Sequence, residues 1–230
     1  MFNPVKKQRL IINAKYGEAV IMANLDDKIG DVYASTDDLE IESKYDTWSG
    51  DYDSDLGGIT YLLPMKTAEI LAKHLNASAV ILDAGAGTGL FGEEIHRAGF
   101  KNLTAIDLSE KMLDMARAKN VYKDVRKMKL GERLDFSDST FDAVSLVGVF
   151  ALGHAKPSSL DEIIRICKTD GIIIFSINKN AYYELGFKNK VEALEHKGSL
   201  IQIEKTEWFI GLGDIEETVY HQITAFRVNK

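Results

Sequence analysis

Cysteine and proline are scarce in this chain, with one cysteine and three prolines among 230 residues. A single cysteine, Cys167, cannot form an intrachain disulfide, which favours a reducing compartment. Apolar runs as long as a membrane span are also absent, and the N-terminus lacks the apolar core of a secretory signal. These absences predict a cytoplasmic protein that does not enter a membrane.

Basic residues are outnumbered, because 28 Lys and Arg stand against 35 Asp and Glu, for a net charge of −7. A general nucleic-acid surface needs a basic face, so we expect no general nucleic-acid binding. The densest basic run, over 117–129, is interpreted as a solvated helix end and an exposed strand face. Apolar residues make up 45% of the chain, which is typical of a globular domain.

Metal-binding patterns are absent as well. Asp51, Asp53 and Asp55 begin like a calcium loop, but Leu56 and Leu62 replace the glycine and glutamate that such a loop requires. Four histidines show no ligand spacing: His74, His96, His196 and His221. We therefore expect no metal site.

Strand and helix patterns alternate through the middle of the chain. Strands are predicted at 79–83, 103–107, 125–130, 141–147 and 171–177, and helices at 61–75, 89–98, 109–119, 157–168 and 181–197. Cys167 shares a helical stripe with Leu160, Ile163 and Ile164 and is predicted to be a buried thiol. Such alternation predicts a Rossmann-like α/β fold, with a mostly parallel sheet covered on both faces.

The two ends of the chain differ from this pattern. Residues 199–209 and 217–228 are predicted strands that form a closing antiparallel hairpin, which brings the sheet to seven strands. Residues 31–55 hold nine acids and one lysine, a composition suited to a solvated lid. We therefore divide the chain into an N-terminal helical cap or lid, 1–58, and a cofactor-binding domain, 59–230.

A glycine-rich turn follows the first of the alternating strands. Gly85, Gly87 and Gly89 come directly after Asp83, and glycine lets the backbone bend sharply and lie against a ligand. Asp107 ends the next strand, 20 residues after Gly87, where a βαβ unit places an acid on a ribose. The pattern predicts a cofactor that contains a nucleoside.

Two cofactor classes compete for this turn. Gly87, Gly89 and Gly92 match the dinucleotide pattern G-x-G-x-x-G, which would make the chain a nicotinamide dehydrogenase. Asp83, however, would repel a pyrophosphate at the end of its strand. An acid there suits a ligand with a cationic amino group, so the dehydrogenase is the less favoured reading.

The spacing Asp83-x-Gly85-x-Gly87-x-Gly89 resembles the first motif of the class I S-adenosylmethionine-dependent methyltransferases. Residues 107–118, 134–144 and 168–175 are similar to later motifs of the same family, whose sheet also ends in a hairpin. The resemblance implies S-adenosylmethionine as cofactor, with Asp83 and the loop at the methionine moiety. It also implies Asp107 at the ribose and Leu108 and Met112 beside the adenine.

A narrower resemblance covers about residues 43–228. Residues 45–55, 130–132 and 147–154 are similar to the methyltransferase-like proteins of the Williams–Beuren chromosomal region and their bacterial relatives. An acid often contacts the adenine after the third strand, and here it is Glu132 or is missing. The implied cofactor-binding residues are Tyr45, Trp48, Asp83, Gly85, Ala86, Gly87, Gly89, Asp107, Leu108, Met112, Gly131, Glu132, Val147 and Gly148.

Candidates on the substrate side are Tyr52, His154 and Tyr182. His154 follows the fourth strand and has the ordinary pKa range of a general base, although a lone loop histidine is commonly structural. Tyr45, Trp48 and Tyr52 suit either a site for the sulfonium or a packing contact of the N-terminal segment.

The predicted reaction is methyl transfer to an unidentified small-molecule acceptor. The Asn-Pro-Pro-Tyr type of motif, used on amino groups of nucleic acid or glutamine, is absent after the fourth strand, where residues 146–149 read Leu-Val-Gly-Val. Two alternatives stay open: a protein methyltransferase, and a protein that binds S-adenosylmethionine without catalysis.

Overall fold

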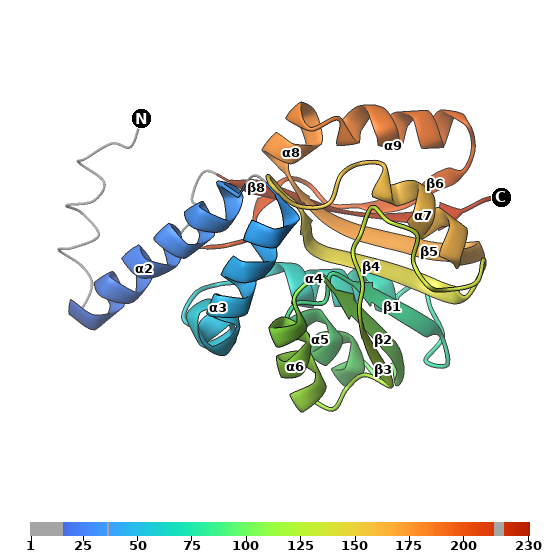
Figure 1. The fold of residues 1–230 in the computed structure, drawn as a ribbon. Coiled ribbons are helices and arrows are strands. Elements are labelled where there is room, and N and C mark those ends of the chain that lie inside the picture. Colours follow the sequence, from blue (N-terminus) through green and yellow to red (C-terminus); the bar gives the residue numbers. More distant parts are fainter. Residues whose placement is uncertain (1–15, 36, 214–218) are drawn as a thin grey trace.

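The computed structural model describes residues 16–35, 37–213 and 219–230, with side chains from residue 25 onward. Its described strands form one eight-stranded sheet with helices on both faces (Figure 1). The strands are β1 (Val80–Ala84), β2 (Asn102–Asp107), β3 (Asp124–Lys127), β4 (Phe141–Phe150), β5 (Cys167–Asn178), β6 (Leu200–Lys205), β7 (Phe209–Ile210) and β8 (Tyr220–Val228).

The strand order is β3-β2-β1-β4-β5-β8-β6, and β7 pairs with β8. The first five strands in this order are parallel, while β8 is antiparallel to both β5 and β6. The Rossmann-like, mostly parallel sheet with closing antiparallel strands is thus confirmed. The order reverses between β1 and β4, and such a switch point opens a crevice at the carboxyl ends of the strands.

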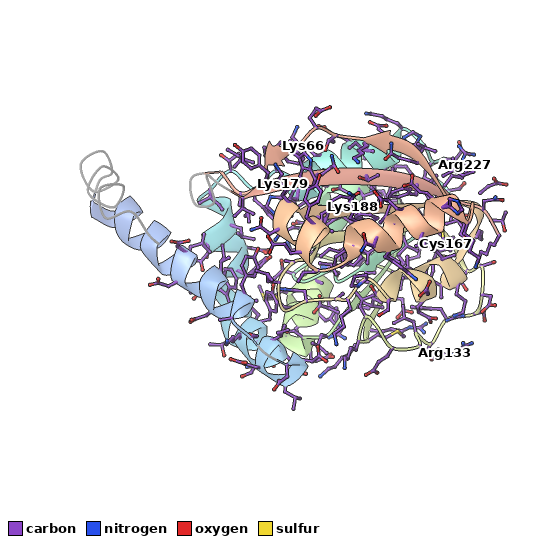
Figure 2. The ribbon with its side chains drawn as sticks, turned by 90° about the horizontal axis from the view of Figure 1, so that it is seen from above. Lys66, Arg133, Cys167, Lys179, Lys188 and Arg227 are labelled. Atoms are coloured by element: carbon purple, nitrogen blue, oxygen red, sulfur yellow. The ribbon has the colours of Figure 1, made fainter. Side chains whose placement is uncertain are left out.

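Two apolar clusters cover the sheet. Helices α4 (Leu63–Ala72) and α5 (Leu90–Arg97) pack on one face, and α7 (Ser159–Ile166) and α9 (Phe187–His196) pack on the other. Helix α6 (Glu110–Ala118) lies beside β2 and β3. Helix α8 (Lys179–Glu184) lies on the same face as α9, and Figure 2 labels Lys179 of α8 and Lys188 of α9. Burial on both faces explains why the central strands are continuous apolar runs.

A third apolar cluster joins the N-terminal helices α2 (Tyr16–Tyr33) and α3 (Asp38–Gly57) to the rest of the chain (Figure 1). Asp37 caps α3, because its side chain accepts a hydrogen bond from the backbone N–H of Glu40. Trp48 of α3 is buried in this cluster with Leu212. No helix in the described ranges is long and apolar enough to cross a membrane.

Three local predictions were wrong. The segment 199–209 forms two strands, β6 and β7, so the described sheet has eight strands instead of seven. Gly186, with φ of 86°, separates α8 from α9 where one helix was predicted. Cys167 begins β5 opposite Phe141 and does not lie on a helix. Its thiol is buried as predicted, and burial raises its pKa to about 12.

Candidate functional site

A cavity of about 290 Å³ opens at the carboxyl ends of the parallel strands. The turn after β1, the residues after β2 and β3, the end of β4 and one side of α3 form its walls. Its position is the one that the switch point between β1 and β4 predicts.

The glycine turn forms one wall of the cavity. The backbone N–H groups of Gly85 and Ala86 both donate to the carbonyl of Ile106, at 2.8 and 3.0 Å, and hold the turn against β2. Gly87 has φ of 54°, and a Cβ atom there would meet nothing within 4 Å. At Gly85, with φ of 83°, a Cβ atom would lie 2.4 Å from Val149. Gly85 therefore permits close packing, while Gly87 leaves bare main chain beside open space.

Asp107 connects this turn to the start of α6. Its Oδ2 atom accepts the backbone N–H of Gly87 at 2.8 Å, and its Oδ1 atom accepts that of Ser109 at 2.9 Å. Partial burial raises the pKa of the carboxyl group, and these backbone hydrogen bonds oppose the rise. The backbone N–H of Leu108 also stabilises the carboxylate, and a carboxylate has about four lone-pair sites, so Asp107 keeps acceptor capacity for a ligand hydroxyl.

Asp83 is 2% exposed and also lines the cavity. Burial raises its pKa to about 7, although hydrogen bonds from Tyr122 and Ser145 counteract part of the rise. The Tyr122 hydroxyl donates to Asp83 Oδ2 at 2.6 Å, and the Ser145 hydroxyl lies 3.4 Å from Oδ1. A cationic group in the cavity would stabilise the carboxylate form.

Sequence reasoning missed Tyr122, and Gly92 was the signal that could have found it. A Cβ atom on Gly92 would lie 2.0 Å from the Tyr122 hydroxyl. The third glycine of the apparent dinucleotide pattern therefore makes room for the phenol that binds Asp83. This contact explains the match to G-x-G-x-x-G without a pyrophosphate.

Helix α3 closes one side of the cavity and is tied to the turn by acidic side chains. Asp53 accepts a hydrogen bond from the Thr88 hydroxyl and pairs with Lys119 at 2.7 Å. Asp46 accepts a hydrogen bond from the Ser109 hydroxyl at 2.6 Å. The acids that resemble a calcium loop thus lie on a helix, and the described residues contain no group of acids and histidines that could hold a metal ion.

Tyr45 and His154 form a hydrogen-bonded pair at the cavity wall. His154 Nδ1 lies 2.7 Å from the carbonyl of Leu152, and a carbonyl only accepts, so Nδ1 carries the hydrogen. Nε2 of the neutral ring then accepts the Tyr45 hydroxyl at 2.7 Å. Burial lowers the pKa of His154, which favours this neutral form.

The cavity brings together most of the residues predicted for the site. Three lie elsewhere. Trp48 is buried behind the wall, with Nε1 donating to Asp55 at 2.7 Å. Gly89 caps α5, and Tyr182 packs 5.8 Å from the Trp208 ring. The predicted residues that line the cavity are Tyr45, Tyr52, Asp83, Gly85, Ala86, Gly87, Asp107, Leu108, Met112, Gly131, Glu132, Val147, Gly148 and His154.

Comparison with known proteins agrees with this geometry. The family model described as "Methyltransferase domain" matches residues 82–175, from β1 through most of β5. Residues 82–175 thus match a methyltransferase domain, and the matched region is less than half of the chain. The matched region begins at Leu82, one residue before Asp83, and it includes the glycine turn, Asp107 and β4.

Individual relatives are methyltransferases by name. The chain is 33% identical to human methyltransferase-like protein 27 over 65% of its length, and 40% identical to malonyl-[acyl-carrier protein] O-methyltransferase of Erwinia pyrifoliae over 42%. The matched regions span only 62% and 36% of those two proteins.

Among solved structures, the TehB-like SAM-dependent methyltransferase of Corynebacterium glutamicum has a TM-score of 0.61 and 17% identity. The match covers 81% of this chain and 99% of that one. This likeness shows that the two proteins share a fold.

Proposed function

We propose that this protein is an S-adenosylmethionine-dependent methyltransferase, with the cofactor in the 290 Å³ cavity. One observation carries the proposal: Asp83, the glycine turn and Asp107 converge on one cavity inside a methyltransferase domain. A reducing, cytoplasmic setting belongs to the same proposal and is supported by the single, buried thiol of Cys167.

The chemistry of the cavity wall fits this cofactor. Asp107 keeps acceptor capacity for a ribose hydroxyl, and a cationic amino group would stabilise the carboxylate form of Asp83. Gly87 leaves open space beside the main chain, while Leu108 and Met112 provide apolar side chains after β2. Bound there, S-adenosylmethionine would supply a methyl group that is already activated as part of a sulfonium.

The chain's own residues would then align the reactants and exclude water. Helix α3 covers the cavity, and its contacts to Thr88 and Ser109 keep it in place. If the acceptor is a hydroxyl, Tyr45 can take its proton while passing its own proton to His154 Nε2. With that proton held on His154, the acceptor oxygen would be free to take the methyl group that the bound cofactor supplies.

A small molecule is the acceptor that we propose. The cavity lies under α3, so a substrate has to fit beside the cofactor within a bounded space. A protein substrate would have to insert one side chain through the same opening.

Titration calorimetry tests the cofactor assignment with S-adenosylmethionine, S-adenosylhomocysteine and NAD. We expect micromolar binding of the first two and no binding of NAD. Binding of NAD alone would overturn the proposal in favour of a dehydrogenase. An acceptor screen with a labelled methyl donor follows, and tight cofactor binding without any transfer would favour a non-catalytic binding protein.

A further inference from the structure

A second cavity of about 60 Å³ adjoins the first. It lies between the N-terminal helices and the carboxyl ends of β4 and β5. Tyr45, Tyr52, Tyr61 and Gly148 line both cavities, so these residues form the boundary between them. A water molecule takes up roughly 30 Å³ in the liquid, so the second cavity has room for a small chemical group.

The wall of this second cavity carries no formal charge among the described residues that line it. His221 borders the cavity as a neutral ring at pH 7, because burial lowers its pKa to about 4. Burying an ion without a counter-ion costs far more than burying a neutral polar group. The cavity therefore favours an uncharged occupant over an ammonium or a carboxylate.

Asn178 brings hydrogen-bond donors to this wall. Its Oδ1 atom accepts the backbone N–H of Ala181 at 2.7 Å and caps α8, which fixes Nδ2 as the donor end of the amide. No described residue accepts a hydrogen bond from Nδ2, yet Nδ2 is not among the fully enclosed polar atoms that lack a partner. Because Asn178 is only 4% exposed and borders the second cavity, we place the accessible surface of Nδ2 at the cavity. Its N–H groups are then free for a ligand.

The Tyr52 hydroxyl is a second free donor, at the boundary between the two cavities. It likewise has no hydrogen-bond partner among the described residues and is not fully enclosed. Burial raises the pKa of Tyr52 well above its ordinary value, so the hydroxyl keeps its proton at neutral pH. Polar groups in protein interiors are normally hydrogen-bonded, so two free donors on one wall indicate that an acceptor arrives from outside.

We infer that the second cavity is a substrate subsite, in which Asn178 Nδ2 and the Tyr52 hydroxyl donate to a neutral carbonyl oxygen of the methyl acceptor. A carbonyl oxygen only accepts hydrogen bonds and carries no formal charge, so it matches two free donors without a counter-ion. The inference rests on the proposed function, because the methyl acceptor has to reach the cofactor cavity past Tyr52 and Gly148. It narrows the acceptor to neutral small molecules with a carbonyl group, and it disfavours a free carboxylate or a lysine side chain.

Trp48 provides a direct readout, because it lines the second cavity and its ring centroid lies 4.7 Å from that of Tyr52. Trp208 is the other tryptophan of the chain, so all indole emission of the W208F variant comes from Trp48. With S-adenosylhomocysteine present at pH 7, W208F is titrated with acetamide, acetate and ethylamine. We expect a saturable change with acetamide, and an apparent affinity at least tenfold weaker for the two ions.

The W48F variant is the matched control, since its remaining indole, Trp208, does not line the cavity. The subsite would be overturned by a saturable acetamide response in W48F, by none in W208F, or by equal responses of W208F to acetamide and acetate. The probe titrations leave Asn178 and Tyr52 unchanged, so they decide the question even if a variant at either position fails to fold.

Two substitutions in the W208F background remove the donors one at a time. Asn178→Asp keeps an oxygen that can cap α8 and loses the N–H donors, and Tyr52→Phe loses only the hydroxyl. We expect acetamide affinity to fall at least twofold in each variant, since one neutral hydrogen bond is worth about two- to tenfold. Unchanged affinity in either folded variant would refute that residue as a donor to the carbonyl.

Calorimetry with S-adenosylhomocysteine on the W208F sample separates the two proposals. We expect micromolar binding of S-adenosylhomocysteine together with the preference for acetamide. A sample that does not bind S-adenosylhomocysteine refutes the methyltransferase, whereas tight cofactor binding without the acetamide preference refutes the subsite alone.

Discussion

Asp83 is a buried acid whose pKa of about 7 lies close to neutral pH. Below that pH the carboxyl group is mostly protonated and cannot pair with a cationic amino group. Because binding of the amino group favours the carboxylate, we expect affinity for S-adenosylhomocysteine to rise about tenfold from pH 6 to pH 8. Calorimetry at pH 6 in buffers of different ionisation heat should show proton release.

The Asp83→Asn variant is the control for this pH dependence. It should bind more weakly at pH 8 and lose most of the change between pH 6 and pH 8. A wild-type affinity that is equal at both pH values would show that Asp83 does not contact the charged end of the ligand.

Asp107 has two tasks, since it fixes the backbone at Gly87 and Ser109 and offers lone pairs to the ligand. Hydrogen bonds to charged groups are worth about 1.5–3 kcal/mol each. We therefore expect Asp107→Ala to weaken S-adenosylhomocysteine binding at least tenfold by calorimetry. Unchanged affinity would refute the ribose assignment.

Asp142 offers a matched control for Asp107. It also accepts a backbone N–H, from Val80 at 2.8 Å, but it lies at the amino end of β4, away from the cavity. Asp142→Ala removes this hydrogen bond and the 2.7 Å ion pair with Lys168, so it should lower the free energy of unfolding. Ligand affinity should stay within about twofold, because Asp142 does not line the cavity.

At the scale of elements, helix α3 is held over the glycine turn mainly by side-chain contacts. Asp53 contacts both Thr88 and Lys119. We expect Asp53→Ala to weaken S-adenosylhomocysteine binding about three- to tenfold, to speed ligand dissociation and to speed hydrogen exchange in α3. Asp51→Ala is the control on the same helix, because Asp51 is exposed and lies 3.5 Å from Lys28. Equal effects of the two substitutions would refute a closing role for the Asp53 contacts.

Elements that bury a continuous apolar run could be predicted from the sequence. Both ends of β1, β2 and β4 lie within three residues of the predicted bounds. Hydrophobic periodicity and turn glycines are local signals, so the sequence around each strand is enough to find it. The wrong predictions concern residues whose secondary structure is determined by tertiary contacts. Cys167 has helical spacing but pairs with Phe141 in the sheet.

The site shows the same division between local and distant information. Asp83, Gly87 and Asp107 follow strands, so the sequence places them at one edge of the sheet. Tyr122 is 39 positions from Asp83, and Gly92 indicates a close contact after the turn without identifying the residue that makes it. The sequence also did not indicate which side of α3 faces the cavity. Tyr45 and Trp48 are close in sequence, but of these two only Tyr45 lines the cavity.

At the scale of the whole molecule, the N-terminal helices have an apolar cluster of their own, and the two clusters on the sheet consist of residues after position 58. A chain that begins at residue 59 should therefore keep the sheet but expose Leu212. We expect native-like far-UV circular dichroism and cooperative urea unfolding at a lower midpoint. Affinity for S-adenosylhomocysteine should fall at least tenfold, because Tyr45 and Tyr52 of α3 are lost from the cavity wall. A truncated chain that binds as tightly as the full chain would contradict a cap over the cofactor, and one without cooperative unfolding would place both segments in a single folding unit.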